Sequence, residues 1–191
     1  TVETISMLEN AIRINSKVVV FSDGGKIREI CLEKNIPHRN IKKHHSPRTS
    51  FTSFLYAMLH VLKPILPIEE KDIIESIEKM KDVSKKINSE NISKENPAIQ
   101  ISEWINDSPV IYYPWGLQAA AIRFKNSLQE NAKTHAIIED VIESGHNGIM
   151  SWETPSDMVP VMIEGTDDHP KTKERWNIMR QYFEENDVKY K

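Results

Sequence analysis

Two residues of this chain have the chemistry needed to move a proton between neighbouring carbons of a sugar. Glu130 lies in the segment R-F-K-N-S-L-Q-E-N-A-K, and His146 lies further along, in S-G-H-N-G-I-M-S-W. A carboxylate can carry a proton from one carbon to the next, and an imidazole can exchange a proton with the ring oxygen near neutral pH. The spacing alone leaves another interpretation open for each. Glu130 can pair with Lys133 or Arg123 on a solvated helix face, and a histidine between glycine and asparagine can be a turn residue.

The elements that position these two groups form an α/β unit in the second half of the chain. Apolar runs and helical periodicity predict strands over 109–113 and 159–165 and helices over 116–131 and 171–186. Glu130 then lies at the C-terminal end of the first of these helices, and His146 lies on a following loop. Residues 188–190 predict a further strand that begins as the chain stops.

The first half of the chain alternates in the same way. Helices are predicted over 2–12 and 26–35, and extended segments over 18–21 and 36–41. Such alternation predicts a parallel sheet. The apolar run 50–62 predicts a buried helix, and a stripe of apolar residues on the charged segment 69–96 predicts an amphipathic connecting helix.

Composition excludes several classes of function. The 25 basic and 28 acidic residues are intermixed and give a net charge of -3, so no basic face for nucleic acid is expected. No run approaches the ~20 apolar residues of a membrane span, and the first residues lack the features of a signal peptide. The single cysteine, Cys31, falls on the apolar side of a helix, so we expect it to pack in the core of a cytoplasmic protein.

No metal site is expected. His38, His44 and His45 lie close together in sequence, but adjacent histidines in a lysine-rich loop point in different directions. No cysteine or aspartate completes a ligand set with them. Gly24 and Gly25 follow a predicted strand and are interpreted as a turn, with a phosphate cradle as the alternative.

Several segments resemble motifs of the bifunctional phosphoglucose/phosphomannose isomerases, a branch of the sugar isomerase (SIS) domain superfamily. R-F-K-N-S-L-Q-E-N-A-K is similar to R-W-K-x-Q-L-N-E-N-A-K, and S-G-H-N-G-I-M-S-W is similar to N-H-N-E-I-x-G-W. Earlier in the chain, F-S-D-G-G-K-I resembles S-S-G-G-K-L, S-P-R-T-S-F resembles Q-P-R-A-A-L, and T-V-E-T-I resembles the continuation of the phosphate loop S-x-S-G-N-T. The resemblance is collinear over nearly the whole chain.

The resemblance implies roles for four residues. Glu130 corresponds to the base that transfers the proton between C1 and C2 through a cis-enediol. His146 corresponds to the histidine that assists ring opening at a dimer interface, where it faces the active site of the neighbouring subunit. Arg48 corresponds to an arginine near the negative charge of the substrate, and its planar fork suits a phosphate or an enediolate oxygen; capping a helix or pairing with an acid is the alternative. Thr1 corresponds to the last threonine of the phosphate loop, where a hydroxyl and helix amides receive an anion.

The chain departs from these motifs at three positions and at both ends. Gly148 stands where H-N-E-I has its acid, Gln129 where an asparagine precedes E-N-A-K, and Ser151 where a glycine precedes the tryptophan. The serines of the phosphate loop would precede Thr1. The family's C-terminal section, with a D-P-T-P threonine and a lysine near the ring-opening histidine, would follow Lys191.

The expected fold is α/β, with two SIS-type subdomains, each a parallel sheet in three layers and each incomplete at a chain end. The predicted divisions are 1–62 for the C-terminal part of the first subdomain, 63–97 for a helical connector and 98–191 for the second subdomain. The expected activity is interconversion of glucose 6-phosphate, and also mannose 6-phosphate, with fructose 6-phosphate by a cytoplasmic homodimer. No metal or organic cofactor is expected, because the enediol route uses only proton transfer. The alternatives are a non-catalytic sugar-phosphate-binding protein and an isomerase of another phosphosugar.

Overall fold

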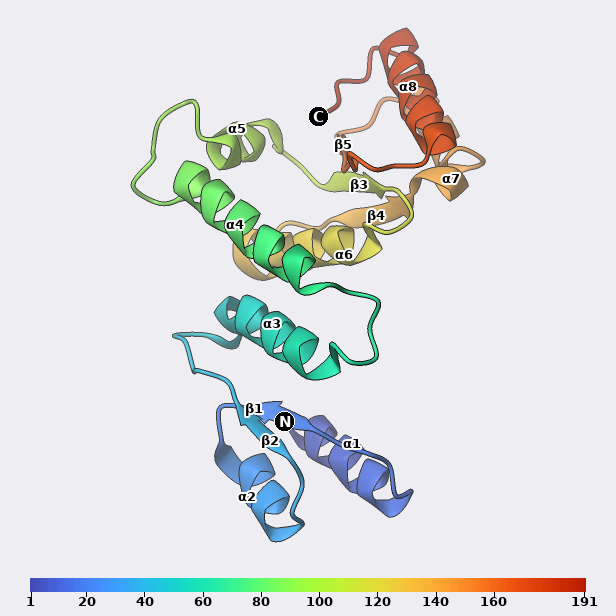
Figure 1. Ribbon diagram of the computed structural model, residues 1–191. Coiled ribbons are helices and arrows are strands. Elements are labelled where there is room, and N and C mark those ends of the chain that lie inside the picture. The colour runs from blue at the N-terminus through green and yellow to red at the C-terminus, as the bar shows by residue number, and fades with distance from the viewer. The chain divides into compact units, whose positions relative to one another are not determined.

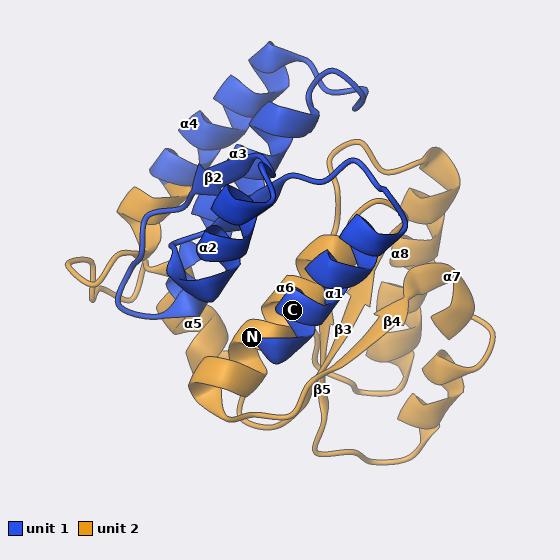
Figure 2. Ribbon diagram, turned by 90° about the horizontal axis from the view of Figure 1, so that it is seen from below, with its two compact units in different colours: residues 1–82 blue, residues 83–191 orange.

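A computed structural model of the chain describes residues 1–191 and divides into two compact units. Unit 1 is Thr1–Asp82 and unit 2 is Val83–Lys191 (Figure 2). Helices and strands alternate along both (Figure 1). None of the helices is both long and apolar enough to cross a membrane.

Unit 1 contains a two-stranded parallel sheet, as the alternation of elements predicts. β1 (Val20–Ser22) pairs with β2 (His38–Asn40), and Val20 lies opposite His38. The helices of this unit are α1 (Val2–Arg13), α2 (Gly25–Glu33), the 3-10 helix η1 (Pro47–Ser50), α3 (Phe51–Leu62) and the first part of α4 (Glu70–Ile87).

A glycine turn joins β1 to α2. Gly24 has a φ of 132° and Gly25 a φ of 69°, both in the region that side chains with a Cβ rarely adopt. The main-chain N–H of Gly24 donates to the hydroxyl of Ser22 at 3.2 Å and fixes the turn on the end of the strand. These glycines therefore form a turn between strand and helix, and the phosphate cradle stays a prediction.

The core of unit 1 lies where α1 and α2 meet β1. Leu8, Val20 and Cys31 are buried there, and Cys31 is only 1% exposed. Burial raises the pKa of the Cys31 thiol, because water no longer solvates the thiolate. The predicted packing role of Cys31 is confirmed.

The prediction of a buried helix over 50–62 was wrong. The helix α3 forms, but none of its residues is buried; Phe51 remains 43% exposed and Met58 39%. A sheet of two strands offers little apolar surface, and α1 and α2 already pack on it. The sequence therefore determines the helix but not what covers it.

Unit 2 is a three-layer α/β sandwich around a parallel sheet of order β4-β3-β5. Its strands are β3 (Pro109–Tyr113), β4 (Ile137–Asp140) and β5 (Val159–Met162). Its helices are α5 (Pro97–Trp104), α6 (Gln118–Ser127), the π-helix η2 (Leu128–Ala132), α7 (Val141–Ser144), the 3-10 helix η3 (Gly148–Glu153) and α8 (Pro170–Glu185). The sequence analysis predicted neither β4 nor α7.

Every residue of β3 is buried, because helices cover both faces of the sheet. Val110 and Tyr112 pack with α8 and with Trp152 of η3, whereas Ile111 and Tyr113 face α5 and α6. This is the alternation of faces expected along a strand. The indole N–H of Trp152 donates to the Tyr112 hydroxyl at 2.8 Å, so the polar atoms of this core pair with each other.

The predicted strand over 188–190 is not formed, but the last residue follows the pattern of one. The N–H of Lys191 donates to the oxygen of Pro160, and the oxygen of Lys191 accepts from the N–H of Met162. Bonding to two alternate residues of a neighbour is the pattern of parallel pairing. The chain therefore runs beside β5 at its end.

Candidate active site

Glu130 lies on the π-helical turn at the end of α6. The turn η2 carries Glu130 with its side chain exposed. Lys133 ends the turn in the left-handed region, with a φ of 59°, and its ammonium donates to the main-chain oxygen of Glu130 at 2.7 Å. π-helical turns and left-handed residues other than glycine concentrate at functional sites. The segment E-N-A-K therefore has a distinctive backbone that presents Glu130 at the surface.

His146 lies in the turn that follows α7. Its main-chain N–H donates to the oxygen of Glu143 at 2.9 Å, and its side chain is exposed. The residue borders a cavity of about 350 Å³ between this turn and α8. The other walls of the cavity are mostly apolar, with Met179 and Tyr182 among them, and Arg175 contributes a positive charge.

The strand β4 separates Glu130 from His146. The π-helical turn leads into the amino end of β4, whereas α7 and His146 follow its carboxyl end. Four residues of strand extend about 13 Å, so the segments that carry Glu130 and His146 join opposite ends of β4.

The sequence analysis missed Glu139, a residue of β4 that lies opposite Tyr112. Its Oε2 atom is buried and has no hydrogen-bond partner, and burial raises the pKa of the Glu139 carboxyl. Burial, together with the nearby charge of Glu139, also raises the pKa of Tyr112 to about 12. The available signal was an acid placed among apolar residues in I-I-E-D, which is weak without the strand assignment.

Glu139 fills the space beside Gly148. A Cβ added at Gly148 would collide with the Glu139 carboxyl, whereas a Cβ at Gly145 would make ordinary contacts. Gly148 is the position at which the pattern H-N-E-I has its acid. A carboxyl from the neighbouring strand therefore occupies the space next to this position.

Arg48 and Thr1 belong to unit 1. Arg48 is exposed on η1, which follows β2, and a cavity of about 150 Å³ lies beside η1, bounded in part by Asp23 and Lys43. The carboxyl ends of parallel strands are the usual ligand side of such sheets. Thr1 is the N-cap of α1, and its hydroxyl accepts from the N–H of Thr4 at 3.3 Å.

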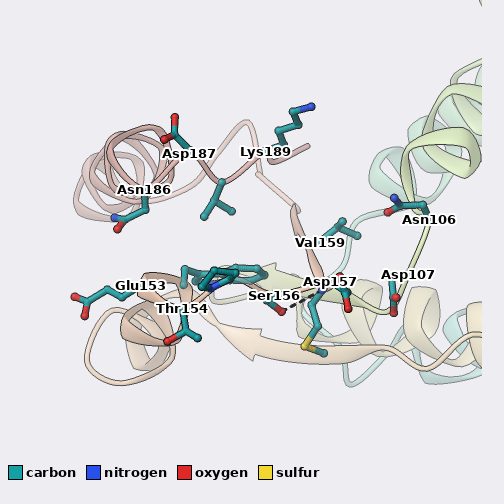
Figure 3. Close-up of a pocket in the computed structure, with 14 residues that line it drawn as sticks. Asn106, Asp107, Glu153, Thr154, Ser156, Asp157, Val159, Asn186, Asp187 and Lys189 are labelled. Carbon is teal, nitrogen blue, oxygen red and sulfur yellow. Dashed lines mark hydrogen bonds between the residues drawn. The ribbon is translucent and has the colours of Figure 1, made fainter.

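In unit 2, a cavity of about 580 Å³ lies at the amino ends of β3 and β5 (Figure 3). Its charged walls include Asp107, Glu153, Asp157 and Asp187, with Lys189 at one end. The labelled acidic side chains point in different directions (Figure 3), and no group of three or more potential ligands is arranged to hold a metal ion. Size alone therefore does not make this cavity the reaction site.

His38 and His44 of unit 1 have separate partners. The Nε2 atom of His38 lies 2.8 Å from the Ser22 hydroxyl, and that of His44 lies 3.5 Å from the hydroxyl of Ser53. Neither belongs to a group of three or more side chains that could hold a metal ion.

Comparison with solved structures supports the fold. A protein of Clostridium difficile 630, provisionally described as a phosphosugar isomerase, aligns with 91% of this chain and 51% of its own, with a TM-score of 0.53 and 13% sequence identity. The two proteins thus share an α/β fold. The model of the bacterial phospho-glucose isomerase C-terminal SIS domain matches residues 94–191. The chain belongs to that family.

Curated relatives carry two kinds of name. The bifunctional phosphoglucose/phosphomannose isomerase of Aquifex aeolicus is 27% identical over 191 residues, which cover 97% of this chain and 56% of the relative. The protein of the same name from Pyrobaculum calidifontis is 30% identical, over 81% of this chain and 46% of its own. The D-glucosamine-6-phosphate 4-epimerase of Sulfolobus acidocaldarius is 24% identical, over 85% and 52% respectively. The chain therefore spans about half the length of the relatives it matches.

Proposed function

We propose that the protein is an aldose-ketose isomerase that interconverts glucose 6-phosphate and mannose 6-phosphate with fructose 6-phosphate. The observation that carries the proposal is the exposed carboxylate of Glu130 on the π-helical turn of E-N-A-K. The membership of residues 94–191 in the phospho-glucose isomerase family supports it.

The proposed reaction needs three steps of proton movement. His146 assists opening of the sugar ring by exchanging a proton at the ring oxygen. The Glu130 carboxylate then removes the proton from C2 of the aldose, which leaves a cis-enediolate. The hydroxyl proton passes from O2 to O1, and Glu130 returns its proton to C1 to give the ketose. Arg48 holds negative charge on the substrate through its planar fork, and Thr1 lies at the end of the phosphate site.

We also propose that the enzyme works as a homodimer in which His146 serves the neighbouring site. Glu130 precedes β4 and His146 follows it, and in this proposal a second copy brings the two together. Apolar side chains are exposed on the elements around His146: Ile142 is 41% exposed, Met150 53% and Ile178 65%. Exposed apolar residues grouped in this way are typical of a protein interface, which a second copy of the chain would cover.

A second candidate is epimerisation of an amino sugar phosphate. The observation that favours it is the similarity to the D-glucosamine-6-phosphate 4-epimerase of Sulfolobus acidocaldarius, which extends over 85% of this chain. Epimerisation inverts the configuration at C4, whereas isomerisation moves the carbonyl group between C1 and C2. Product analysis therefore separates the two activities.

The experiment offers the intact protein fructose 6-phosphate and D-glucosamine 6-phosphate separately and follows both by NMR. The proposal expects glucose 6-phosphate and mannose 6-phosphate from the first substrate and no change in the second. A change confined to C4 of the amino sugar would replace the isomerase proposal with the epimerase. Binding of fructose 6-phosphate in calorimetry without any product would instead identify a non-catalytic binding protein.

A further inference from the structure

The space under the turn that carries His146 is filled by a side chain from another element. Glu139 projects from β4 on the sheet face that Tyr112 shares, which is the face covered by η3 and α8. Its carboxyl approaches Gly148, the first residue of η3, so closely that a Cβ there would collide with Oε2 unless the end of the Glu139 side chain moved. The contact therefore joins a long side chain at 139 to a residue without one at 148.

The polar chemistry of this contact is unusual for a strand residue. The Oε2 atom of Glu139 is inaccessible to solvent and has no hydrogen-bond partner. A buried polar atom without a partner costs free energy, so such atoms are rare unless they serve a purpose. The neighbouring Tyr112 hydroxyl accepts the Trp152 indole N–H.

The hydrogen bonds of the turn go to its neighbours in sequence, and Ile149 beside it packs against the core. The His146 N–H bonds to the oxygen of Glu143, and the Asn147 side chain donates to the Glu143 carboxylate at 3.2 Å. Both bonds return to α7, a helix of four residues. Contact with Glu139 instead joins the turn to the sheet, which is the rigid part of unit 2.

We propose that Glu139 is a positioning residue for His146: its side chain holds the turn 145–148 at a fixed distance from the sheet, and Gly148 provides the space for it. The inference rests on the proposed function in one respect, that His146 acts in ring opening. Glu139 itself contacts neither the substrate nor the reacting atoms. Loss of the contact would shift the His146 imidazole by less than the width of its ring. It would leave Arg48 and Thr1 of unit 1 in place.

The test compares five variants of the intact protein. Glu139→Ala empties the space, Gly148→Ala overfills it, and the double variant Glu139→Ala/Gly148→Ala replaces one side chain with the other. Gly145→Ala is the matched control, because this glycine also adjoins His146 but its added Cβ would lie 3.4 Å from the oxygen of Ile142, an ordinary contact. Glu139→Gln keeps the shape of the side chain and is the conservative variant.

Hydrogen exchange of the amides of residues 145–150 reports the turn without requiring turnover. We expect faster exchange in both Glu139→Ala and Gly148→Ala, recovery in the double variant, and wild-type exchange in Gly145→Ala and Glu139→Gln. Two results would overturn the proposed contact. One is an unchanged exchange rate in Glu139→Ala. The other is an increase in exchange in the double variant equal to the sum of the increases in the two single variants. These outcomes hold whether or not the protein isomerises hexose phosphates.

Kinetics with fructose 6-phosphate test the consequence for the reaction. A misplacement of about 1 Å can cost about 100-fold in rate, so kcat should fall by up to about 100-fold in Glu139→Ala while KM changes little. Glu139→Gln should restore kcat. If kcat stayed at the wild-type value in Glu139→Ala while exchange of the turn increased, Glu139 would be structural only and the positioning role would be wrong.

Discussion

Glu130 leads into the amino end of β4, and His146 follows the carboxyl end of the same strand. The strand of four residues between them extends about 13 Å. In the proposed dimer, the Glu130 carboxylate and the His146 imidazole of one subunit belong to two different sites. This relationship gives the proposed dimer a chemical reason beyond the burial of apolar surface.

Mixed dimers test this arrangement. Glu130→Gln and His146→Ala, each inactive alone, should recover about a quarter of wild-type kcat when mixed, because half of the dimers are mixed and each has one intact site. Recovery is measured after the two variants are unfolded and refolded together. The control mixes two preparations of Glu130→Gln, which should stay inactive. If the mixture of Glu130→Gln and His146→Ala were also inactive, Glu130 and His146 would have to act within one subunit.

Arg48 should affect binding of the substrate rather than the chemical step. Arg48→Lys keeps the charge but loses the planar fork, so KM for fructose 6-phosphate should rise by about 10-fold or more with kcat nearly unchanged. Arg39→Lys, an exposed substitution on β2, is the control and should leave KM unchanged. Equal KM values for Arg48→Lys and the wild type would assign the residue a structural role.

The pH dependence of stability should change when Glu139 is neutralised. Burial raises the pKa of this carboxyl above its ordinary value of 4.5, so its contribution to stability is complete below that value and is lost as the pH rises through the pKa in the folded protein. Glu139→Gln should therefore have a higher Tm than the wild type at pH 7, and the difference should vanish near pH 4. Thermal unfolding between pH 4 and pH 8 measures this. A Tm difference that is constant with pH would show that the carboxyl does not titrate differently on folding.

Phe183 should be essential for the core of unit 2. It is 0% exposed, and its ring lies 6.2 Å from that of Tyr112 and 5.8 Å from that of Trp152. Phe183→Ala should lower the free energy of unfolding by about 3–5 kcal/mol. Gln181→Ala, an exposed substitution on the same helix, should change it by no more than about 0.5 kcal/mol. Denaturant unfolding of both variants provides the comparison, and similar losses would contradict this account of the core.

Sequence patterns predicted the elements whose side chains repeat regularly. The run P-V-I-Y-Y gave β3 with its observed bounds, because a strand buried on both faces is continuously apolar. The segment I-I-E-D did not reveal β4, since it is short and has acids at two of its four positions. The position of Glu139 beside Gly148 could therefore not be predicted, because it depends on a strand that the sequence pattern did not indicate.

Only part of the candidate site could be predicted from the sequence. Motif resemblance selected Glu130 and His146, and the structure places both at the surface of unit 2. Their separation by β4 depends on the order of elements in space, which local spacing does not contain. The exposure of α3 is a further example, since its apolar composition predicts a helix but not what covers it.

Solvent exchange tests the central claim, that Glu130 is the base of a sugar-phosphate isomerase. Fructose 6-phosphate is incubated with the protein in D2O, and NMR follows deuterium at C1 of the ketose and at C2 of the aldose product. The wild type should incorporate deuterium at both carbons, Glu130→Gln should lose at least about 100-fold in rate, and Glu103→Gln, an exposed acid of α5, should match the wild type. No incorporation by the wild type, or incorporation by Glu130→Gln at the wild-type rate, would contradict the claim.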